Sequence, residues 1–308
     1  MEAATARNHV LAEELDFEAD ATIVSLTLER TARRGPPFRT IPLMGLPFAV
    51  VDEAKTVEHV LGELARGRGG WLCTANLDIL RQWHRSPDVR GLLAGVDIVV
   101  ADGMPIVWAS ALQGTPLPER VAGSTLTSTL SAAAAQTGAS VFLLGGDPGA
   151  AAAAGAILGE RNPGLALAGT HFPPFGFEQQ PDAIAEIEFA LAASQPDIVF
   201  VGLPFPRQEL LIQRLRALLP NSWFIGCGVT FSFIAGDIKR APRLVQRFGL
   251  EWLHRLVQEP SKLWRRYLLD GLPFMVELMS SSIVGRRRPA LQIESSTVSL
   301  QIESSTGS

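Results

Sequence analysis

The stretch VDIVVADGMPIVW occupies residues 96–108 and decides how the rest of the chain is interpreted. Its mostly apolar run stops at Asp102-Gly103, after which apolar residues resume from Met104. A short apolar run that ends at a turn signal predicts a buried strand, here followed by a helix. In open α/β folds ligands bind at the carboxyl ends of the strands, which makes Asp102 a candidate site residue. An isolated Asp-Gly is also a common turn or helix cap, so the flanking pattern has to discriminate.

Five further apolar runs alternate with helical stretches around this one. The six expected strands are 71–75, 96–101, 139–145, 165–169, 196–202 and 222–228. The expected helices between and after them are 77–86, 104–112, 123–137, 148–160, 181–194 and 207–219. Upstream, IPLMGLPFAV (41–50) predicts a hairpin and DEAKTVEHVLGELARG (52–67) a helix. Strands separated by helices form βαβ units, so the expected fold is α/β: a Rossmann-like, mostly parallel sheet with helices on both faces.

Composition divides the chain into four parts. Residues 1–40 form an N-terminal extension with one candidate strand at 22–28, and residues 41–238 carry the regular α/β pattern. Residues 239–288 are expected to form a helical, basic, aromatic-rich appendage. Residues 289–308 contain LQIESST twice and are expected to be a disordered tail.

Charge is segregated along the chain. The net charge is −4, yet residues 239–288 hold eleven Lys and Arg against four acids, a net of +7. A basic end beside an acidic remainder favours an anionic partner or surface. In GLEWLHRLVQEPSKLWRRYLLDGLPFMVELM (249–279), apolar and basic residues are interleaved. These helices are expected either to pack on the core with solvated basic faces or to enter a lipid headgroup layer, and the residues alone leave both readings open.

Other sequence features limit the class of protein. Cys73 and Cys227 lie inside apolar runs and the five His form no metal motif, so neither a disulfide nor a metal site is expected. The N-terminus has no apolar signal-peptide core. The most apolar segment, LLDGLPFMVELM, is interrupted by Asp270, Pro273 and Glu277. A cytoplasmic protein that does not cross a membrane is therefore expected.

Polar and glycine-rich segments follow the expected strands and should meet at one sheet edge. The turn Gly145–Gly149 does not fit the G-x-G-x-x-G fingerprint, which disfavours a nicotinamide oxidoreductase. This turn could offer backbone N–H groups to a phosphate or simply permit a tight bend, and both readings stay open. Pro206-Arg207-Gln208-Glu209 is either an ordinary first helical turn or a source of polar groups for a base, sugar or phosphate.

Several motifs together carry a family resemblance. They are TAN, ADGMPIV, RVAGSTL, VFLLGGDPG, PDIVFVGLPFPRQE, FIGCGVTFSFIAG, KRAP and GLEWLHRLVQEPSKLWRRY. In this order and at roughly this spacing, residues 41–270 resemble the WecG/TagA/CpsF glycosyltransferases (glycosyltransferase family 26). The resemblance implies an inverting transferase that needs no metal or other cofactor. It moves a sugar from a UDP-sugar (N-acetylmannosamine, its uronic acid, or a hexose) onto a polyprenyl-diphosphate-linked saccharide during surface polysaccharide synthesis.

The resemblance also implies roles for residues and partners. Asp102 is expected to be the catalytic base. The expected substrate-binding residues are Thr74, Asn76, Gly103, Arg120, Gly145, Gly146, Gln208 and Glu209. The expected contacts to lipid or diphosphate are Arg240, Arg255, Arg265 and Arg266. The partners are the donor, the lipid-linked acceptor and an anionic membrane at the inner face of the cytoplasmic membrane; no nucleic acid is expected, and a homo-oligomer is left open.

The chain departs from the family pattern in three places. Ser232 follows Phe231 where the family usually has Asp, Leu203-Pro204-Phe205 is bulkier than the usual glycine-rich segment, and THFPPFGF (170–177) replaces a shorter motif. These departures bear on donor and acceptor identity more than on reaction class. The Ser232 departure also motivates an alternative, a non-catalytic nucleotide-sugar-binding or scaffold subunit with the same fold.

Overall fold

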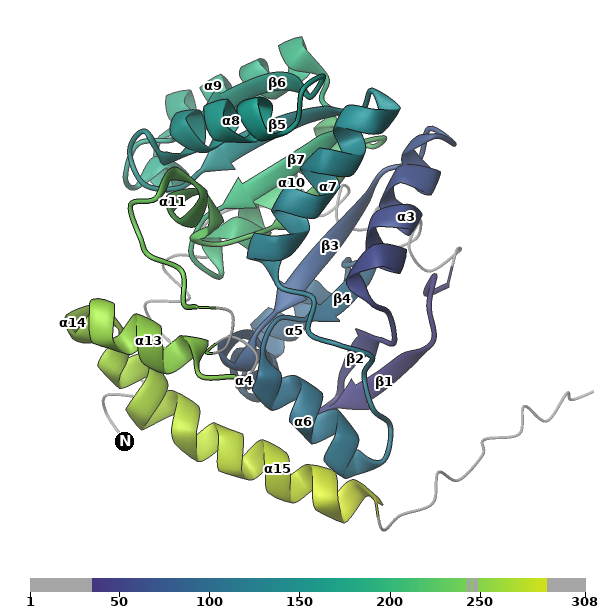
Figure 1. Ribbon diagram of the computed structural model, residues 1–308, viewed down its shortest axis with the longest axis vertical. Helices are drawn as coiled ribbons and strands as arrows, with labels where there is room; N and C mark the ends of the chain where they lie inside the picture. The colour runs from purple at the N-terminus through teal and green to yellow at the C-terminus, as the bar shows by residue number, and fades with distance from the viewer. Residues whose placement is uncertain (1–34, 243–244, 246–248, 287–308) are drawn as a thin grey trace, which may run out of the picture.

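The computed structural model describes residues 35–242, 245 and 249–286. The candidate strand at 22–28 and the repeated tail motif fall outside these residues. A six-stranded sheet, in which every adjacent pair is parallel, forms the centre of the molecule, in the order β4-β3-β8-β7-β5-β6 (Figure 1). Its strands are β3 (Gly70–Ala75), β4 (Ile98–Ala101), β5 (Ser140–Gly145), β6 (Ala166–His171), β7 (Ile198–Gly202) and β8 (Trp223–Gly226). The expected parallel α/β fold is confirmed, with small shifts at the strand ends.

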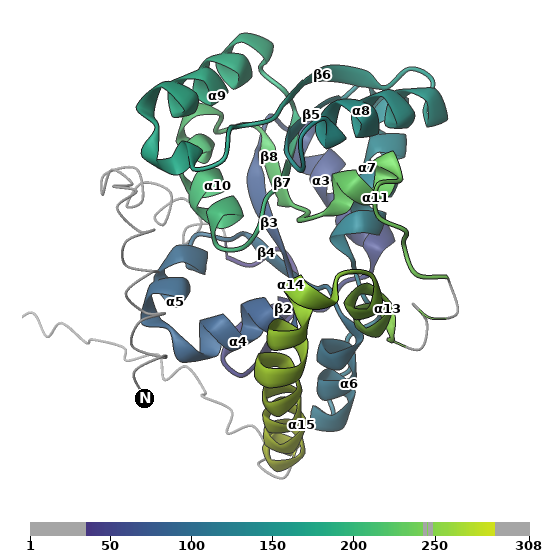
Figure 2. The ribbon, with the colours of Figure 1, turned by 90° about the vertical axis from the view of Figure 1, so that its left-hand side faces the viewer.

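Helices cover both faces of this sheet because successive strand residues point to opposite sides. In β7, Val199 and Val201 belong to one apolar core, and Ile198 and Phe200 belong to the other. The first core is closed by α4 (Leu77–Arg85), α5 (Pro87–Leu93), α9 (Pro181–Ser194) and α10 (Arg207–Leu218) (Figure 2). The second is closed by α3 (Glu53–Leu64), α7 (Gly123–Thr137), α8 (Ala150–Arg161) and α11 (Thr230–Ala235).

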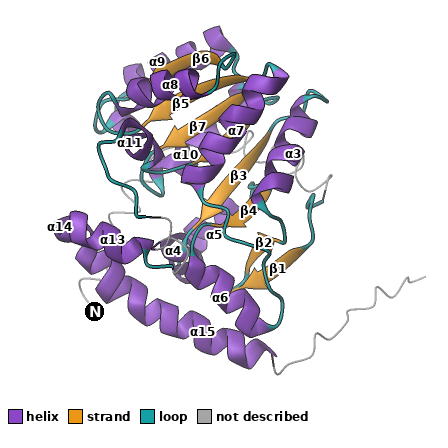
Figure 3. Ribbon diagram, in the orientation of Figure 1, coloured by secondary structure: helices purple, strands orange, loops and turns teal. Residues whose placement is uncertain are grey.

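The remaining core elements show where periodicity alone was insufficient. The hairpin β1 (Thr40–Leu43) and β2 (Leu46–Ala49) and the helix α6 (Met104–Gln113) were expected and are present (Figure 3). The short helices α5 and α11 and the 3-10 turn η1 (Phe177–Gln179) were not predicted. Such elements are too short to display a helical apolar period, and α11 is instead defined by its buried Phe231.

The C-terminal region is helical, as expected. It comprises α13 (Glu251–Gln258), α14 (Pro260–Trp264), the π-helical turn η2 (Arg265–Gly271) and α15 (Leu272–Arg286). Helix α15 lies along α6, and its Phe274 and Leu278 are fully buried in the same core as the hairpin. The appendage is therefore in part a packed component of the core.

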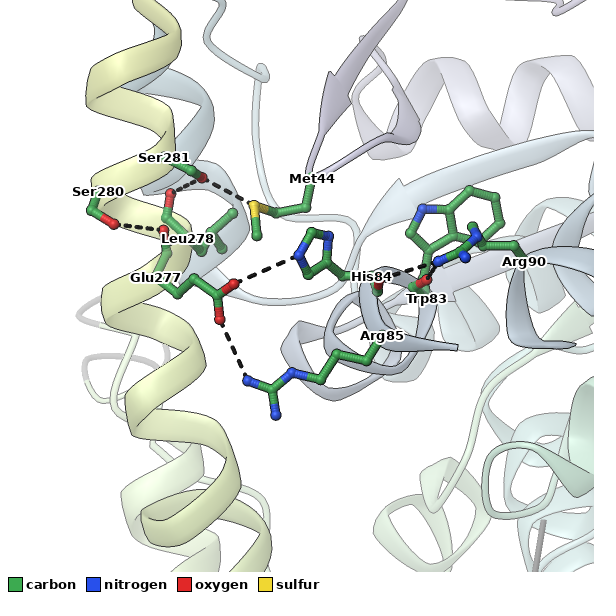
Figure 4. A network of polar contacts seen from close by, with 9 residues as sticks. All are labelled: Met44, Trp83, His84, Arg85, Arg90, Glu277, Leu278, Ser280 and Ser281. Atoms are coloured by element: carbon green, nitrogen blue, oxygen red, sulfur yellow. Dashed lines mark hydrogen bonds and ion pairs between the residues drawn. The ribbon is translucent and has the colours of Figure 1, made fainter. Parts of the chain in front are cut away.

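Polar contacts also attach α15, although they contribute less than the burial of Phe274. Figure 4 shows Glu277 between His84 and Arg85 of α4, with oxygen–nitrogen distances of 3.6 Å and 3.4 Å. One turn further on, the Ser281 hydroxyl donates to the Met44 sulfur at 3.0 Å. Because these side chains are substantially exposed, each ion pair adds at most about 1 kcal/mol.

The segment Arg265–Arg286 differs from expectation in its continuity. Over its most apolar 18 residues the mean hydropathy is 1.3 and only 17% of the residues are buried, so by length and composition this 22-residue helix could cross a membrane. Asp270, Pro273 and Glu277 interrupt the apolar run of the sequence, but they do not interrupt the helix. Pro273 follows the wide π-helical turn, in which the Leu272 N–H donates to the Tyr267 carbonyl, so the helix continues past the proline.

Two aspartates, at the amino ends of β4 and β7, hydrogen-bond to neighbouring strands at the sheet edge opposite Asp102. Asp97 and Asp197 each accept the backbone N–H of the neighbouring strand, from Trp71 and Ser140 respectively, at 2.7 Å. The buried Arg216 guanidinium donates to Asp97 at 2.7 Å and to the Gly95 carbonyl at 2.6 Å. This ion pair joins α10 to the amino end of β4.

Replacing Arg216 by Leu should lower the free energy of unfolding by about 3 kcal/mol, because Asp97 would keep a largely buried charge without its cation. Urea denaturation followed by circular dichroism measures the change. Arg214→Leu is the control, since its ion pair with Glu188 is exposed and should be worth less than about 1 kcal/mol. Equal losses in the two variants would show that burial of the Arg216 pair is unimportant.

Candidate functional site

A cavity of about 590 Å³ lies at the carboxyl edge of the sheet, between the strand ends and the C-terminal helices. The strand ends and the loops that follow them contribute Thr74, Asn76, Asp102, Gly103, Arg120, Gly146, Asp147, Gln208 and Gly228. The C-terminal helices contribute Glu251, Trp252, Arg255, Glu259, Leu263, Arg266, Tyr267, Leu272 and Met275. The appendage is thus one wall of the pocket.

Asp102 is held at the mouth of β4 by its own backbone and by a neighbouring amide. Its N–H donates to the Ala75 carbonyl at 2.9 Å, and its Oδ2 accepts the Gly123 N–H at 3.3 Å. Burial raises the pKa of Asp102 to about 6, although Arg120 and the Gly123 amide act in the opposite direction. A pocket carboxyl with this pKa is ionised at neutral pH and is basic enough to accept a proton.

Thr74 and Asn76 line the pocket but already have structural partners. The Thr74 hydroxyl donates to the Gly226 carbonyl at 2.8 Å, which ties β3 to β8. The Asn76 Oδ1 caps α4 by accepting the N–H groups of Asp78 and Ile79, at 3.0 Å and 3.1 Å. A ligand would therefore meet the amide nitrogen of Asn76 and the oxygen lone pairs of Thr74.

Gln208, on the pocket wall, and Glu209, behind it, form a buried hydrogen-bonded pair. Gln208 accepts the Gly228 N–H at 2.9 Å and donates its amide to Glu209 Oε1 at 2.8 Å. A side chain at Gly226 would come within 2.1 Å of the Gln208 amide, so glycine is required there. Glu209 is fully buried and does not line the pocket, so among the described residues its place is behind Gln208.

The glycine turn after β5 is shaped by close packing. Gly145 and Gly146 have φ of +100° and +86°, and a Cβ at Gly145 would lie 2.9 Å from the Leu203 side chain. Gly145 does not line the pocket, whereas Gly146 does. The Gly146 N–H already donates to the Gly202 carbonyl at 2.6 Å, which removes one of the donors that the turn could have offered to a phosphate.

The position that departs from the family pattern has a carboxylate partner. The buried Ser232 hydroxyl, on α11, donates to Asp147 Oδ2 at 2.8 Å, and both residues line the pocket. Asp147 was not singled out from the sequence, where it stood in a glycine-rich turn. Its sequence signals were its place at the carboxyl end of β5 and within the motif VFLLGGDPG.

The cations of the pocket are paired with carboxylates that lie beside them. Arg120 binds Glu251 at 2.6 Å, and Arg266 binds Asp78 at 3.0 Å; each pair links the core to the appendage.

The other three predicted arginines lie differently. Arg255 lines the pocket and binds Glu259 at 3.6 Å, within the appendage. Arg240 contacts Glu251 at 3.6 Å from outside the pocket lining. Arg265 is exposed over the Trp264 ring, also outside the lining.

No three His, Cys, Asp or Glu side chains gather as a metal-binding group in the part of the chain that the structure describes. Cys73 and Cys227 are free and buried. Burial raises the pKa of the Cys227 thiol to about 12 and that of Cys73 well above its usual value, so both remain core thiols.

Comparison with known proteins identifies the family. The Glycosyl transferase WecG/TagA/CpsF family profile matches residues 41–288. The chain belongs to the WecG/TagA/CpsF glycosyltransferase family. A relative from Bacillus spizizenii (strain ATCC 23059 / NRRL B-14472 / W23), N-acetylglucosaminyldiphosphoundecaprenol N-acetyl-beta-D-mannosaminyltransferase, is 33% identical over 231 residues, which cover 75% of this chain and 87% of the relative. The resemblance and the assignment as a glycosyltransferase are confirmed, and the match extends through the appendage.

Burial raises the pKa of Glu209 to about 7, although the Gln208 hydrogen bond lowers it. Because the folded state then binds more protons than the unfolded state between about pH 4.5 and 7, Glu209 should reduce stability as pH rises through this window. The free energy of unfolding of Glu209→Gln, relative to that of wild type, should therefore rise by up to roughly 3 kcal/mol between pH 5 and pH 8. Thermal unfolding at both pH values measures this gain, with the exposed Glu160→Gln as control. Parallel pH dependence of wild type and Glu209→Gln would contradict it.

Proposed function

We propose that this glycosyltransferase moves a sugar from a UDP-sugar onto a polyprenyl-diphosphate-linked saccharide, with inversion and at the membrane surface. The observation that carries the proposal is Asp102, a pocket carboxyl with a raised pKa at the carboxyl edge of the sheet, facing a wall that holds arginines. The name of the Bacillus relative describes transfer of N-acetylmannosamine to an undecaprenyl-diphosphate-linked sugar, which supports this substrate class. N-acetylmannosamine, its uronic acid and a hexose remain the candidate donor sugars.

The proposed chemistry divides between a base and a group of cations. Asp102 removes the proton of the acceptor hydroxyl as that oxygen attacks the anomeric carbon from the side opposite the leaving group. The departing diphosphate gains negative charge, which Arg120, Arg255 and Arg266 stabilise. These arginines are paired with carboxylates in the structure, so donor binding exchanges one anionic partner for another. The proposed reaction requires no metal ion.

The membrane contact is proposed to lie along the helix Arg265–Arg286. Leu269, Leu272, Val276 and Ile283 form an exposed apolar stripe at helical spacing, while Phe274 on another face of the helix is buried. Because α15 buries Phe274 and Leu278 on one face against the core, the helix is suited to lie in the headgroup layer rather than to span the bilayer. Leu272 belongs to both the stripe and the pocket lining, so a lipid-linked acceptor can pass directly from one to the other.

Transfer of radiolabelled sugar from a panel of UDP-sugars to a synthetic polyprenyl-diphosphate saccharide tests the reaction. Wild type should transfer with EDTA present, and Asp102→Asn should cost about two orders of magnitude or more in rate. Because only the ionised base accepts a proton, kcat/KM of wild type should fall as pH drops through about 6. Tight UDP binding without transfer from any donor would instead support the non-catalytic alternative. Loss of activity in EDTA that Mg²⁺ restores would contradict the metal-independent mechanism.

Membrane attachment should depend on the exposed apolar stripe and on Arg265, the basic residue at the start of this helix. The double variant Val276→Gln, Arg265→Glu should sediment with anionic vesicles roughly tenfold more weakly than wild type, since it removes exposed apolar area and reverses one charge. Its UDP affinity should be unchanged, because neither residue lines the pocket.

A matched double variant, Phe189→Gln, Arg161→Glu, serves as the control. It changes an exposed aromatic residue and an exposed arginine on α9 and α8, away from the appendage, and should sediment like wild type. If both double variants sediment equally, the apolar stripe is not the membrane contact.

A further inference from the structure

The carboxylate of Asp147 differs from most other acidic groups of the pocket. Glu251, Glu259 and Asp78 each have an arginine partner, and the Asp102 carboxylate accepts a backbone amide while Arg120 lowers its pKa. Among the described residues, Asp147 contacts no cation through its side chain and instead accepts a hydroxyl, that of Ser232 at 2.8 Å. It is therefore an anion with unused acceptor capacity on the pocket surface.

Ser232 fixes where this carboxylate lies. The serine is 1% exposed, sits on the short helix α11 and has its hydroxyl directed at Asp147 Oδ2. Helix α11 packs closely against α8, which begins just after the turn that carries Asp147. The carboxylate is thus held in one orientation, which lowers the entropic cost of using it to bind a ligand.

The chemistry of an unpaired carboxylate selects its ligand. It only accepts hydrogen bonds, so it attracts hydroxyl groups and repels phosphates. The neighbouring Gly146 N–H is already bonded to Gly202, which further weakens this turn as a phosphate site. The arginines that could hold a diphosphate, Arg120, Arg255 and Arg266, pair with other carboxylates of the pocket.

We propose that Asp147, oriented by Ser232, recognises hydroxyl groups of the nucleotide-sugar donor. The donor diphosphate then lies toward the arginines, and a hydroxyl-bearing part of the donor, either the ribose or the transferred sugar, lies against the β5–α8 turn. This assignment rests on the proposed use of a UDP-sugar.

Titration calorimetry with full-length protein distinguishes the two sources of hydroxyls. The probes are UDP, 2′-deoxy-UDP, a UDP-sugar that wild type transfers, and inorganic pyrophosphate. If the ribose is bound, Asp147→Asn should lower the affinity for UDP roughly tenfold or more. Wild type should then bind 2′-deoxy-UDP weakly, and the Asp147→Asn substitution should lower this affinity little further. If the sugar is bound, UDP affinity should be unchanged and UDP-sugar affinity should fall by a similar factor.

Pyrophosphate and a serine variant complete the test. Pyrophosphate affinity should stay within about twofold of wild type in Asp147→Asn, because the carboxylate is not at the phosphate site. Ser232→Ala should reduce affinity for the same probe as Asp147→Asn, but by a smaller factor, because the carboxylate remains without its orienting hydroxyl. Thermal unfolding of both variants confirms that they are folded.

The outcomes that overturn the proposal are distinct from those that overturn the proposed function. Wild-type affinities for both UDP and UDP-sugar in Asp147→Asn would leave the pair with a purely structural role. A marked gain in pyrophosphate affinity would place the diphosphate at the turn and reverse the proposed donor orientation. If wild type itself bound neither UDP nor any UDP-sugar, the proposed donor class would fail and this assignment with it.

Discussion

Parallel pairing of the six strands is the constraint on which the rest of the structure depends. Since every strand runs the same way, all carboxyl ends reach one edge and all amino ends the other. The aspartates at the two edges have different environments. At the amino edge, Asp97 and Asp197 accept backbone N–H groups of neighbouring strands, and Arg216 neutralises one of them. At the carboxyl edge, Asp102 remains partly exposed to a cavity.

The carboxyl edge becomes a pocket only because the C-terminal helices cover it. Phe274 and Leu278 bury α15 against the core, and the pairs Arg120–Glu251 and Arg266–Asp78 join the two parts beside the cavity. The same ion pairs keep cations ready in a low-dielectric site, where they can exchange a carboxylate for a phosphate. Packing, electrostatics and the proposed lipid contact are therefore properties of one helical element.

Burying carboxyl groups lowers the stability of this protein, but it fixes the positions of groups at the pocket. Glu209 is completely buried with a pKa raised to about 7, and its role is to hold Gln208, which in turn holds the Gly228 backbone at the pocket. Asp102 likewise has a raised pKa because it is removed from water. Such groups are typical of functional sites, where a charge is kept in an environment that would not be selected for stability alone.

The sequence by itself determined the α/β class, the six strands, most helices and the family, because apolar period and turn residues are local signals and the motifs are long. It also located Asp102, since a carboxylate directly after a buried strand must reach the carboxyl edge. It could not separate lining residues from supporting ones: Glu209 and Gln208 are adjacent in sequence, yet only tertiary packing puts one behind the other. Nor could it place Asp147 beside Ser232, which are 85 residues apart and meet only because α11 packs on α8. The helix likewise continues through Pro273 because of the π-helical turn, a backbone adjustment that no residue pattern predicts.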